Sequence, residues 1–265
     1  DLRSNPGLTE AQAREEYKAI GSMILENDPH GRLIAIHPTG TGTVREFAPE
    51  PWMGFADYQQ MYPNLHAGLL ASRVGDKPVV NSEYAYYLRD QDEDGVVDKH
   101  NSFDVDSIRH ATWDIAMGGG YFVTGFGNTY FGGNRNPGPF DIRAEQDDIW
   151  EEQIQFVKRL FEDLEWWLLE PHDDLISAPV DRSEDRRRTF ERDGRTRSLW
   201  RPPETTFWAL AEPGRQYVGY VRGLTGGVSL DLGEGDFLGR QFDPRNGVFT
   251  ELDLVCVEGK WAYMP

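Results

Sequence analysis

A repeated order of strand and helix over residues 10–167 is the feature that most constrains the fold of this chain. Short apolar runs, typical of strands buried in a parallel sheet, are found at residues 33–36, 54–59, 78–83 and 120–125. Apolar residues at helical spacing predict helices at residues 10–26, 62–73, 106–117 and 147–167. Thr9 and Gln12 form a capping box that marks the start of the first helix. This alternation predicts an α/β fold with a parallel sheet and helical crossovers.

The sequence changes character after Pro171. Residues 181–197 are rich in Arg and Asp and nearly free of apolar side chains, which indicates a solvated connector or an exposed hairpin. Residues 206–211 and 216–221 flank the turn sequence Glu-Pro-Gly-Arg and predict a β-hairpin, and further short strands follow it. We therefore expect an α/β part over residues 1–171 and a small antiparallel β-sandwich domain over residues 172–265.

The charge of the chain limits its partners. It has 27 Lys and Arg residues against 45 Asp and Glu residues, a net charge of −18. This charge repels nucleic acid and anionic membrane surfaces, and no apolar stretch reaches the roughly 20 residues that a membrane helix requires. We expect no nucleic-acid partner and no membrane partner. The single cysteine, Cys256, cannot form an internal disulfide and leaves the redox compartment undecided.

Glu83 is the main catalytic candidate. Active sites of parallel β/α folds lie where strands end in loops, and Glu83 ends the third apolar run. Tyr84 follows it directly, with two further tyrosines nearby. A carboxylate among aromatic rings suits a glycosidase, because the rings stack on sugar C–H faces while the carboxylate attacks or stabilises the oxocarbenium-like centre. The alternative is a structural carboxylate paired with an arginine such as Arg109.

Several further residues are candidates for binding substrate. His37, at the end of the first apolar run, can donate to a sugar hydroxyl or be a satisfied structural group. Arg109 can hold Glu83 ionised through a charge-assisted bond or tie down the acidic loop. Trp52, Trp113 and Tyr121 are candidate stacking platforms, with core packing the stronger interpretation for Trp113.

His66 differs from His37 in its place along the chain. It belongs to a predicted helix and follows no strand end. We therefore interpret it as structural.

An acidic loop after Glu83 fits the start of an EF-hand-type calcium site. Residues 90–98 read D-x-D-x-D-G-x-x-D, with the glycine in the position of the sharp turn. The expected ligands are Asp90, Asp92, Asp94, the Val96 carbonyl and Asp98. Position 12 of the loop is Asn101 where the pattern has Glu, and an unstructured acidic loop is the alternative. The ion would brace a loop beside the site, and no organic cofactor is expected because the glycine-rich segments lack nucleotide-loop spacing.

Six segments resemble one known family. PVVNSEYAYY (78–87), followed by RHATWDIAMGGGYFVTGFG (109–127), resembles the seventh and eighth strand regions of apiosidase-like glycoside hydrolases. NDPHGRLIAIHPTG (27–40) and WMGFADYQQMYPNLH (52–66) are similar to the fifth and sixth strand regions of that group. EPHDDLISAP (170–179) and YVGYVRGLTGGVSLDL (217–232) are similar to the small β-domain that follows the barrel.

The resemblance implies the second half of a (β/α)8 TIM-type barrel over residues 1–171 and an accessory β-sandwich after it. Glu83 would be the nucleophile at the end of strand seven. The partner acid/base would lie at the end of strand four, upstream of Asp1, so the N-terminal half of the barrel is expected from a preceding segment or from another chain. Gly54 stands where the sixth strand of the family has an Asp, which leaves the role of Asp57 open.

The implied function is a secreted glycoside hydrolase, extracellular or periplasmic, that cleaves plant, algal or microbial polysaccharides or oligosaccharides with retention. A non-catalytic carbohydrate-binding or adhesion protein, with an aromatic cleft, is the alternative from another class. A metal-dependent hydrolase that uses the Asp cluster is a weaker third possibility. A second carboxylate within about 5 to 5.5 Å of Glu83 would distinguish the retaining enzyme.

Overall fold

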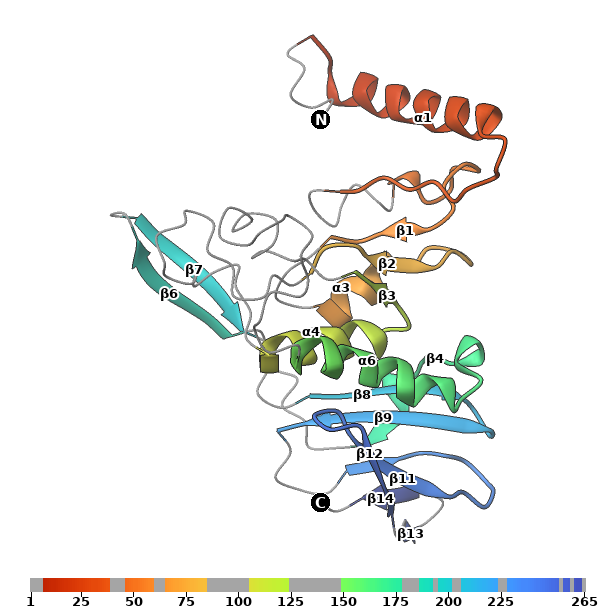
Figure 1. Cartoon of the computed structure of the whole chain (residues 1–265), viewed down its shortest axis with the longest axis vertical. Helices are drawn as coiled ribbons and strands as arrows, with labels where there is room; N and C mark the ends of the chain where they lie inside the picture. The colour runs from red at the N-terminus through yellow and green to blue at the C-terminus, as the bar shows by residue number, and fades with distance from the viewer. Residues whose placement is uncertain are drawn as a thin grey trace.

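The computed structural model describes residues 7–38, 46–59, 65–84, 105–123, 149–177, 186–192, 195–201, 206–223, 228–252, 255–257 and 260–263. Within these ranges the fold is mixed α/β, with a parallel sheet in the N-terminal half and antiparallel sheets in the C-terminal half. Helix α1 lies at one end of the long axis and the last strands lie at the other, while the hairpin of residues 186–201 projects to the side (Figure 1). None of the described helices is both long and apolar enough to cross a bilayer.

The parallel sheet has the order β1-β2-β3, and its strands are short. They are β1 (Ala56–Asp57), β2 (Val79–Asn81) and β3 (Tyr121–Phe122). Each lies within a run predicted to be a strand. The first run, residues 33–36, forms only one parallel bridge, between Ile34 and Met53. The continuous buried strand predicted there is thus only partly formed: Ile34 and Ile36 pack against the core, whereas the side chain of Leu33 is 72% exposed.

Four helices lie where the apolar spacing predicts them. They are α1 (Glu10–Asn27), α3 (Leu65–Ser72), α4 (Val105–Ala116) and α6 (Ile149–Glu162). The capping box is formed, since Gln12 N–H donates to Thr9 Oγ1 at 3.3 Å and Thr9 N–H donates to Gln12 Oε1 at 2.9 Å. The last helix ends earlier than residue 167, and a 3₁₀ turn, η2 (Trp166–Leu168), follows it.

Helix α1 packs closely on the loop before β1. A Cβ added at Gly21 would lie 2.3 Å from the ring of Trp52, so only glycine allows this approach. The ring of Tyr17 meets that of Phe47 edge-on, with centroids 5.8 Å apart. These contacts join α1 to a core that also includes Tyr58, which is fully buried.

Antiparallel strands form the C-terminal half. One sheet has the order β4-β8-β9, a second has the order β13-β14-β10-β5, and two hairpins are β6–β7 and β11–β12. Their bounds are β4 (Glu170–Pro171), β5 (Ile176–Ser177), β6 (Arg186–Arg192), β7 (Arg195–Arg201), β8 (Thr206–Glu212), β9 (Gln216–Arg222), β10 (Val228–Leu230), β11 (Gly239–Asp243), β12 (Val248–Leu252), β13 (Val255–Val257) and β14 (Lys260–Tyr263); between β4 and β5 lies the 3₁₀ turn η3 (Asp173–Leu175).

Two local predictions are confirmed in this half. The predicted hairpin is β8–β9, and Gly214 in its turn has φ 83°, a conformation that favours glycine. The Arg-rich stretch after residue 181 contains the hairpin β6–β7, which confirms the hairpin interpretation over the connector.

The two halves share a core. The ring of Trp113 on α4 stacks on that of Tyr220 on β9, with centroids 5.5 Å apart and planes 6° from parallel. Met117 and Val157 pack into the same cluster with Leu210 of β8. Helix α4 is therefore buried between the parallel sheet and the antiparallel sheet.

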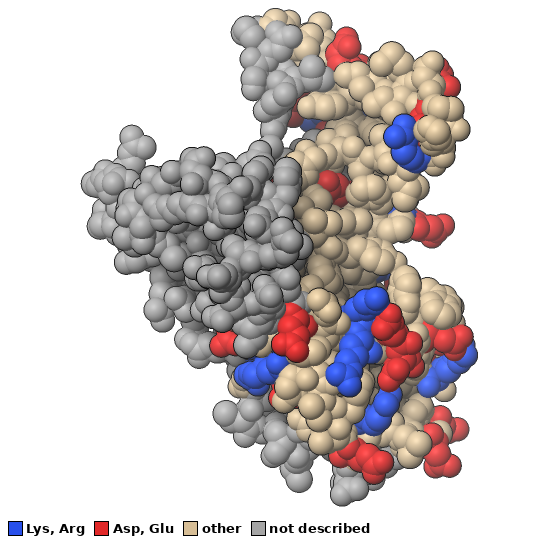
Figure 2. Space-filling view, viewed as in Figure 1, with Lys and Arg blue, Asp and Glu red and all other residues tan. Residues whose placement is uncertain are grey.

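Ion pairs cover the outer face of the C-terminal half. Acidic and basic side chains alternate there on the part of the surface that is described (Figure 2). Arg215 pairs with Glu165 and Glu212, and Arg240 pairs with Asp163. These pairs partly neutralise the acidic surface in this region.

Candidate active site

Three consecutive strand regions bring polar side chains to one edge of the parallel sheet. His37 follows the bridge at Ile34, Gln59 follows β1, and Glu83 follows β2. His37 Nε2 lies 3.0 Å from Glu83 Oε2, and Gln59 Nε2 donates to the same oxygen at 2.6 Å. The side chain of His37 is 52% exposed and that of Glu83 is 25% exposed. His37 and Glu83, each predicted separately as a site residue, are thus in direct contact at a solvent-accessible edge.

The second ring nitrogen of His37 also has partners. Nδ1 lies 2.8 Å from Ser82 Oγ and 3.3 Å from Asp57 Oδ2. Asp57 is only 4% exposed, and its Oδ1 has no hydrogen-bond partner within the described structure. The imidazole therefore joins the carboxylate at the end of β1 to the carboxylate after β2.

The backbone at Glu83 is fixed by a buried amide. Asn81, the last residue of β2, is fully buried, and its Oδ1 accepts a hydrogen bond from Glu83 N–H at 3.1 Å. An Asn side chain that bonds the backbone two residues on forms an Asx-turn. This turn ends the strand and presents Glu83 at the edge of the sheet.

Two predicted substrate-binding rings lie in the core. Trp52 is 4% exposed and packs against Gly21 of α1. Tyr84 is fully buried and shares a hydrogen bond with Thr112 Oγ1 at 2.6 Å, and burial raises the pKa of its hydroxyl. Their interpretation as substrate-binding groups is corrected here, because neither ring presents a face to solvent.

Arg109 and Tyr121 are also placed away from Glu83. Arg109 is 3% exposed, and its guanidinium donates to Gln153 Oε1 at 2.7 Å and to Asp106. It therefore ties α4 to α6 and does not hold Glu83 ionised. Tyr121 is 46% exposed and meets the ring of Trp166 edge-on, with centroids 6.0 Å apart.

The register of the sheet shows how far Tyr121 lies from the cluster. Tyr121 pairs with Val80, three residues before Glu83 and on the other side of the turn that ends β2. An exposed ring at this position is displaced from the edge of the sheet where Glu83 lies.

Sequence reasoning gave no role to Gln59 or Ser82. Asp57 and Gln59 are at positions i and i+2 of the sequence, so on an extended backbone their side chains point to the same side. Ser82 is adjacent to Glu83, and its polarity at the end of an apolar run was the available signal. Which partner each side chain would meet depended on the pairing of segments far apart in the chain.

The predicted calcium ligands, residues 90–98, lie outside the described residues. In the remainder of the chain that is described, no group of three or more His, Cys, Asp or Glu residues is arranged to hold a metal ion. The calcium site stays a prediction from the sequence.

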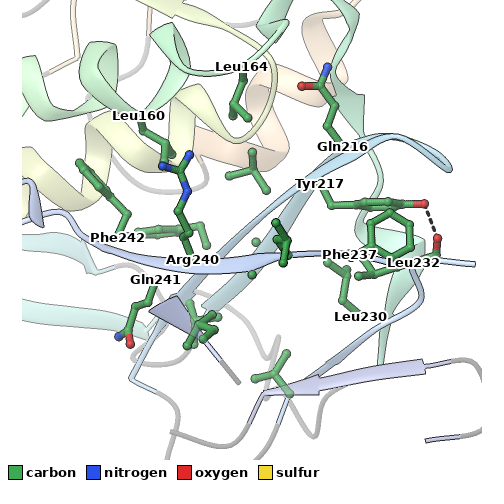
Figure 3. A pocket seen from close by; sticks show the side chains of 18 of the residues that line it. Leu160, Leu164, Gln216, Tyr217, Leu230, Leu232, Phe237, Arg240, Gln241 and Phe242 are labelled. Atoms are coloured by element: carbon green, nitrogen blue, oxygen red, sulfur yellow. Dashed lines mark hydrogen bonds between the residues drawn. The ribbon is translucent and has the colours of Figure 1, made fainter. Parts of the chain in front are cut away.

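A cavity of about 430 Å³ lies in the C-terminal half, away from Glu83. Leu160 of α6, Leu164 just after that helix, Tyr217 and Phe242 line it, with Arg240 among them (Figure 3). No carboxylate, imidazole or thiol is among its described lining residues. The Glu83 cluster, where a carboxylate and an imidazole are in contact, is the better candidate for chemistry.

Two solved structures are similar in fold. One, a glycoside hydrolase family 5 protein from Bacteroides vulgatus ATCC 8482, has a TM-score of 0.60 and 16% identity over 96% of this chain and 54% of its own. The other, described as a glycoside hydrolase, has a TM-score of 0.58 and 15% identity over 97% of this chain and 57% of its own. The chain thus spans little more than half the length of either structure.

Sequence comparison assigns the family. No curated protein sequence matches the chain significantly. The family model described as "Apiosidase-like, catalytic domain" matches residues 3–168, which is more than half of the chain and contains His37, Gln59 and Glu83. The chain therefore belongs to the apiosidase-like family.

Proposed function

We propose that the chain supplies the nucleophile of a retaining glycoside hydrolase, and that Glu83 is this nucleophile. The observation that carries the proposal is the environment of its carboxylate. Glu83 follows the parallel strand β2 at an accessible edge, and two donors, His37 and Gln59, meet one of its oxygens at 3.0 Å and 2.6 Å. Hydrogen bonds to a carboxylate favour its ionised form, which is the form that attacks carbon.

In the proposed reaction a carboxylate oxygen of Glu83 forms a bond to the anomeric carbon of the sugar. The bond from that carbon to the leaving-group oxygen breaks, and its electron pair leaves with the oxygen, which takes a proton from a second carboxylic acid. Water, deprotonated by the same group, then releases the sugar from Glu83 with net retention. We propose that the second carboxyl group comes from a strand that precedes those described here, in the same polypeptide or on another chain.

The proposed architecture is the second half of a (β/α)8 barrel, followed by a β-sandwich. The parallel order of Ile34, β1, β2 and β3 and the crossover helices α3 and α4 support the half-barrel. The likeness to two glycoside hydrolase structures supports it further. The proposed substrates are plant, algal or microbial polysaccharides or oligosaccharides.

The non-catalytic alternative depended on an aromatic cleft. Two of the rings that would form it, Trp52 and Tyr84, are buried. The residues at the described edge are instead hydrogen-bonding and ionisable groups, which suit bond cleavage better than stacking.

Glu83→Gln in the natural full-length protein tests the proposal. Turnover of a cleaved aryl glycoside should fall by about 10³-fold or more, because a neutral amide is a poor nucleophile. Glu162→Gln is the matched control, since Glu162 is 63% exposed on α6 and pairs with Lys158 alone among the described residues. Both variants should melt near the wild-type temperature. Hydrolysis by Glu83→Gln at close to the wild-type rate would show that another group attacks the sugar.

A further inference from the structure

Both donors to Glu83 contact the same carboxylate oxygen. Gln59 Nε2 and His37 Nε2 each meet Oε2, and within the described structure no hydrogen bond reaches Oε1. An oxygen that accepts two hydrogen bonds has its lone pairs engaged, whereas the other oxygen keeps its lone pairs free. The two oxygens of this carboxylate are therefore not equivalent.

Gln59 is held in a single orientation. Its Nε2 must face Glu83, because turning the amide would place Oε1 against a carboxylate oxygen, and both are acceptors. The segment is tied to β2, since Tyr58 N–H donates to the Val80 carbonyl at 2.7 Å. A side-chain amide does not titrate, so this donor is present at every pH at which the protein is folded.

His37 needs a proton on Nε2 to donate to Glu83, and the shorter of the two contacts at Nδ1, the one with Ser82, is compatible with that tautomer. Nδ1 lies 2.8 Å from Ser82 Oγ, a good distance for a hydrogen bond, and 3.3 Å from Asp57 Oδ2, a longer one. In the neutral ring Nδ1 is the acceptor, and the hydroxyl of Ser82 can donate to it. The tautomer of a histidine is set by the hydrogen bond that its other nitrogen makes.

We infer that Gln59 directly, and Ser82 through His37, are positioning residues that hold Oε2 of Glu83 and leave Oε1 as the attacking oxygen. The inference rests on the proposed role of Glu83 as nucleophile. The bond formed is Oε1–C1, the bond broken is from C1 to the leaving group, and the leaving group departs with the electron pair. Holding Oε2 fixes the carboxylate plane, and misplacement of a reacting group by about 1 Å costs on the order of 100-fold in rate.

The kinetic test uses the full-length protein and an activated 2-deoxy-2-fluoro-glycosyl fluoride of the sugar that an aryl-glycoside panel identifies. The rate of covalent labelling of Glu83, followed by mass spectrometry, reports the attack step alone. Gln59→Met and Ser82→Ala should each slow labelling by about 10-fold or more, and kcat should fall with KM nearly unchanged. Ser82→Thr keeps the hydroxyl and should restore the rate. Ser229→Ala, which removes a hydroxyl in the antiparallel half, should label like wild type.

Nitrogen-15 NMR of the labelled histidine ring supplies a readout that does not require activity. His37 should carry its proton on Nε2 in the wild type and in Ser82→Thr, and Ser82→Ala should lose this preference. A wild-type His37 protonated on Nδ1, or Ser82→Ala that labels at the wild-type rate, would overturn the role of Ser82. Wild-type labelling of Gln59→Met would overturn the role of Gln59. If the reagent labels a residue other than Glu83 in the wild type, the proposed function fails. The NMR measurement of the His37 tautomer still shows in that case whether Ser82 orients His37.

Discussion

Two histidines in this chain have partners of similar chemistry but different surroundings. His37 lies between Glu83 and Asp57 at the edge of the parallel sheet and is 52% exposed. His66 lies between Asp173 and the Asp114 carbonyl and is 3% exposed. The identity of the partners alone would not show that His66 is structural and that His37 belongs to the proposed active site.

The buried cluster around His66 is satisfied by protein groups. Its Nδ1 faces the Asp114 carbonyl at 3.1 Å, its Nε2 faces Asp173 Oδ2 at 2.8 Å, and its ring stacks on Trp208 with centroids 3.9 Å apart. Asp173 Oδ1 accepts from Ala209 N–H at 2.9 Å, and Asp114 Oδ1 accepts from Trp208 Nε1 at 3.1 Å. This network ties helices α3 and α4 to strand β8.

The edge cluster around His37 keeps acceptors unused. Asp57 Oδ1 and Gln59 Oε1 are buried and have no hydrogen-bond partner within the described structure. A buried acceptor without a partner costs stability, so its presence beside a proposed nucleophile suits a site where a substrate supplies the donor. The two clusters contain the same kinds of residue. They differ in whether the acceptors around the histidine are already hydrogen-bonded to protein groups, and this difference separates the structural histidine from the proposed functional one.

The largest difference should appear on removing each ring. His66→Ala should lower the free energy of unfolding by about 3 to 5 kcal/mol, because it leaves Asp173 and the Asp114 carbonyl without their buried partner. His37→Ala should change it by no more than about 1 kcal/mol, since the ring is half exposed. Chemical denaturation of the two variants gives both values. Equal losses would break the distinction between the clusters.

A third histidine, His110 on α4, makes the buried region sensitive to acid. Burial, and then the charges of Arg222 and Arg109, lower the pKa of His110 to about 4. The folded state therefore binds this proton less readily than the unfolded state. Stability from this residue is fully present above pH about 6.5 and is lost as the pH falls through 4, by at most about 3 kcal/mol.

The variant His110→Gln isolates this effect because glutamine does not titrate. Thermal unfolding of wild type and variant should be compared between pH 7 and pH 4. The wild-type curve should fall more steeply with acid, and the difference between the two curves removes the contribution of carboxylates and of the other histidines. Parallel curves would show that the pKa of His110 does not differ between the folded and the unfolded state.

Calcium binding at residues 90–98 is predicted from the sequence alone and can be tested by protein stability. If the sequence motif at residues 90–98 binds the ion, a concentration 100 times the dissociation constant stabilises the folded protein by about 2.7 kcal/mol. EDTA should lower the melting temperature, and added calcium should restore it. The double variant Asp92→Asn and Asp94→Asn should no longer respond to EDTA. A wild-type protein that melts identically with and without chelator argues against the site.

The sequence by itself determined the local features. Thr9 and Gln12 start α1, the turn with Gly214 joins β8 to β9, and the end of an apolar run marks Glu83. Each of these depends on residues close together in the chain, so spacing and turn chemistry suffice to predict it. The polar edge of the sheet was predictable for the same reason, because parallel strands align their ends.

The tertiary structure decided which partner each side chain meets. His37 and Glu83 are 46 residues apart in sequence, and Arg109 reaches Gln153 on another helix 44 residues away. In the sequence, Trp52 and Tyr84 cannot be distinguished from aromatic residues that bind sugar. Packing against α1 and α4 buries their rings. Periodicity states which side of an element a residue occupies, but the element that covers that side is fixed by contacts between distant segments.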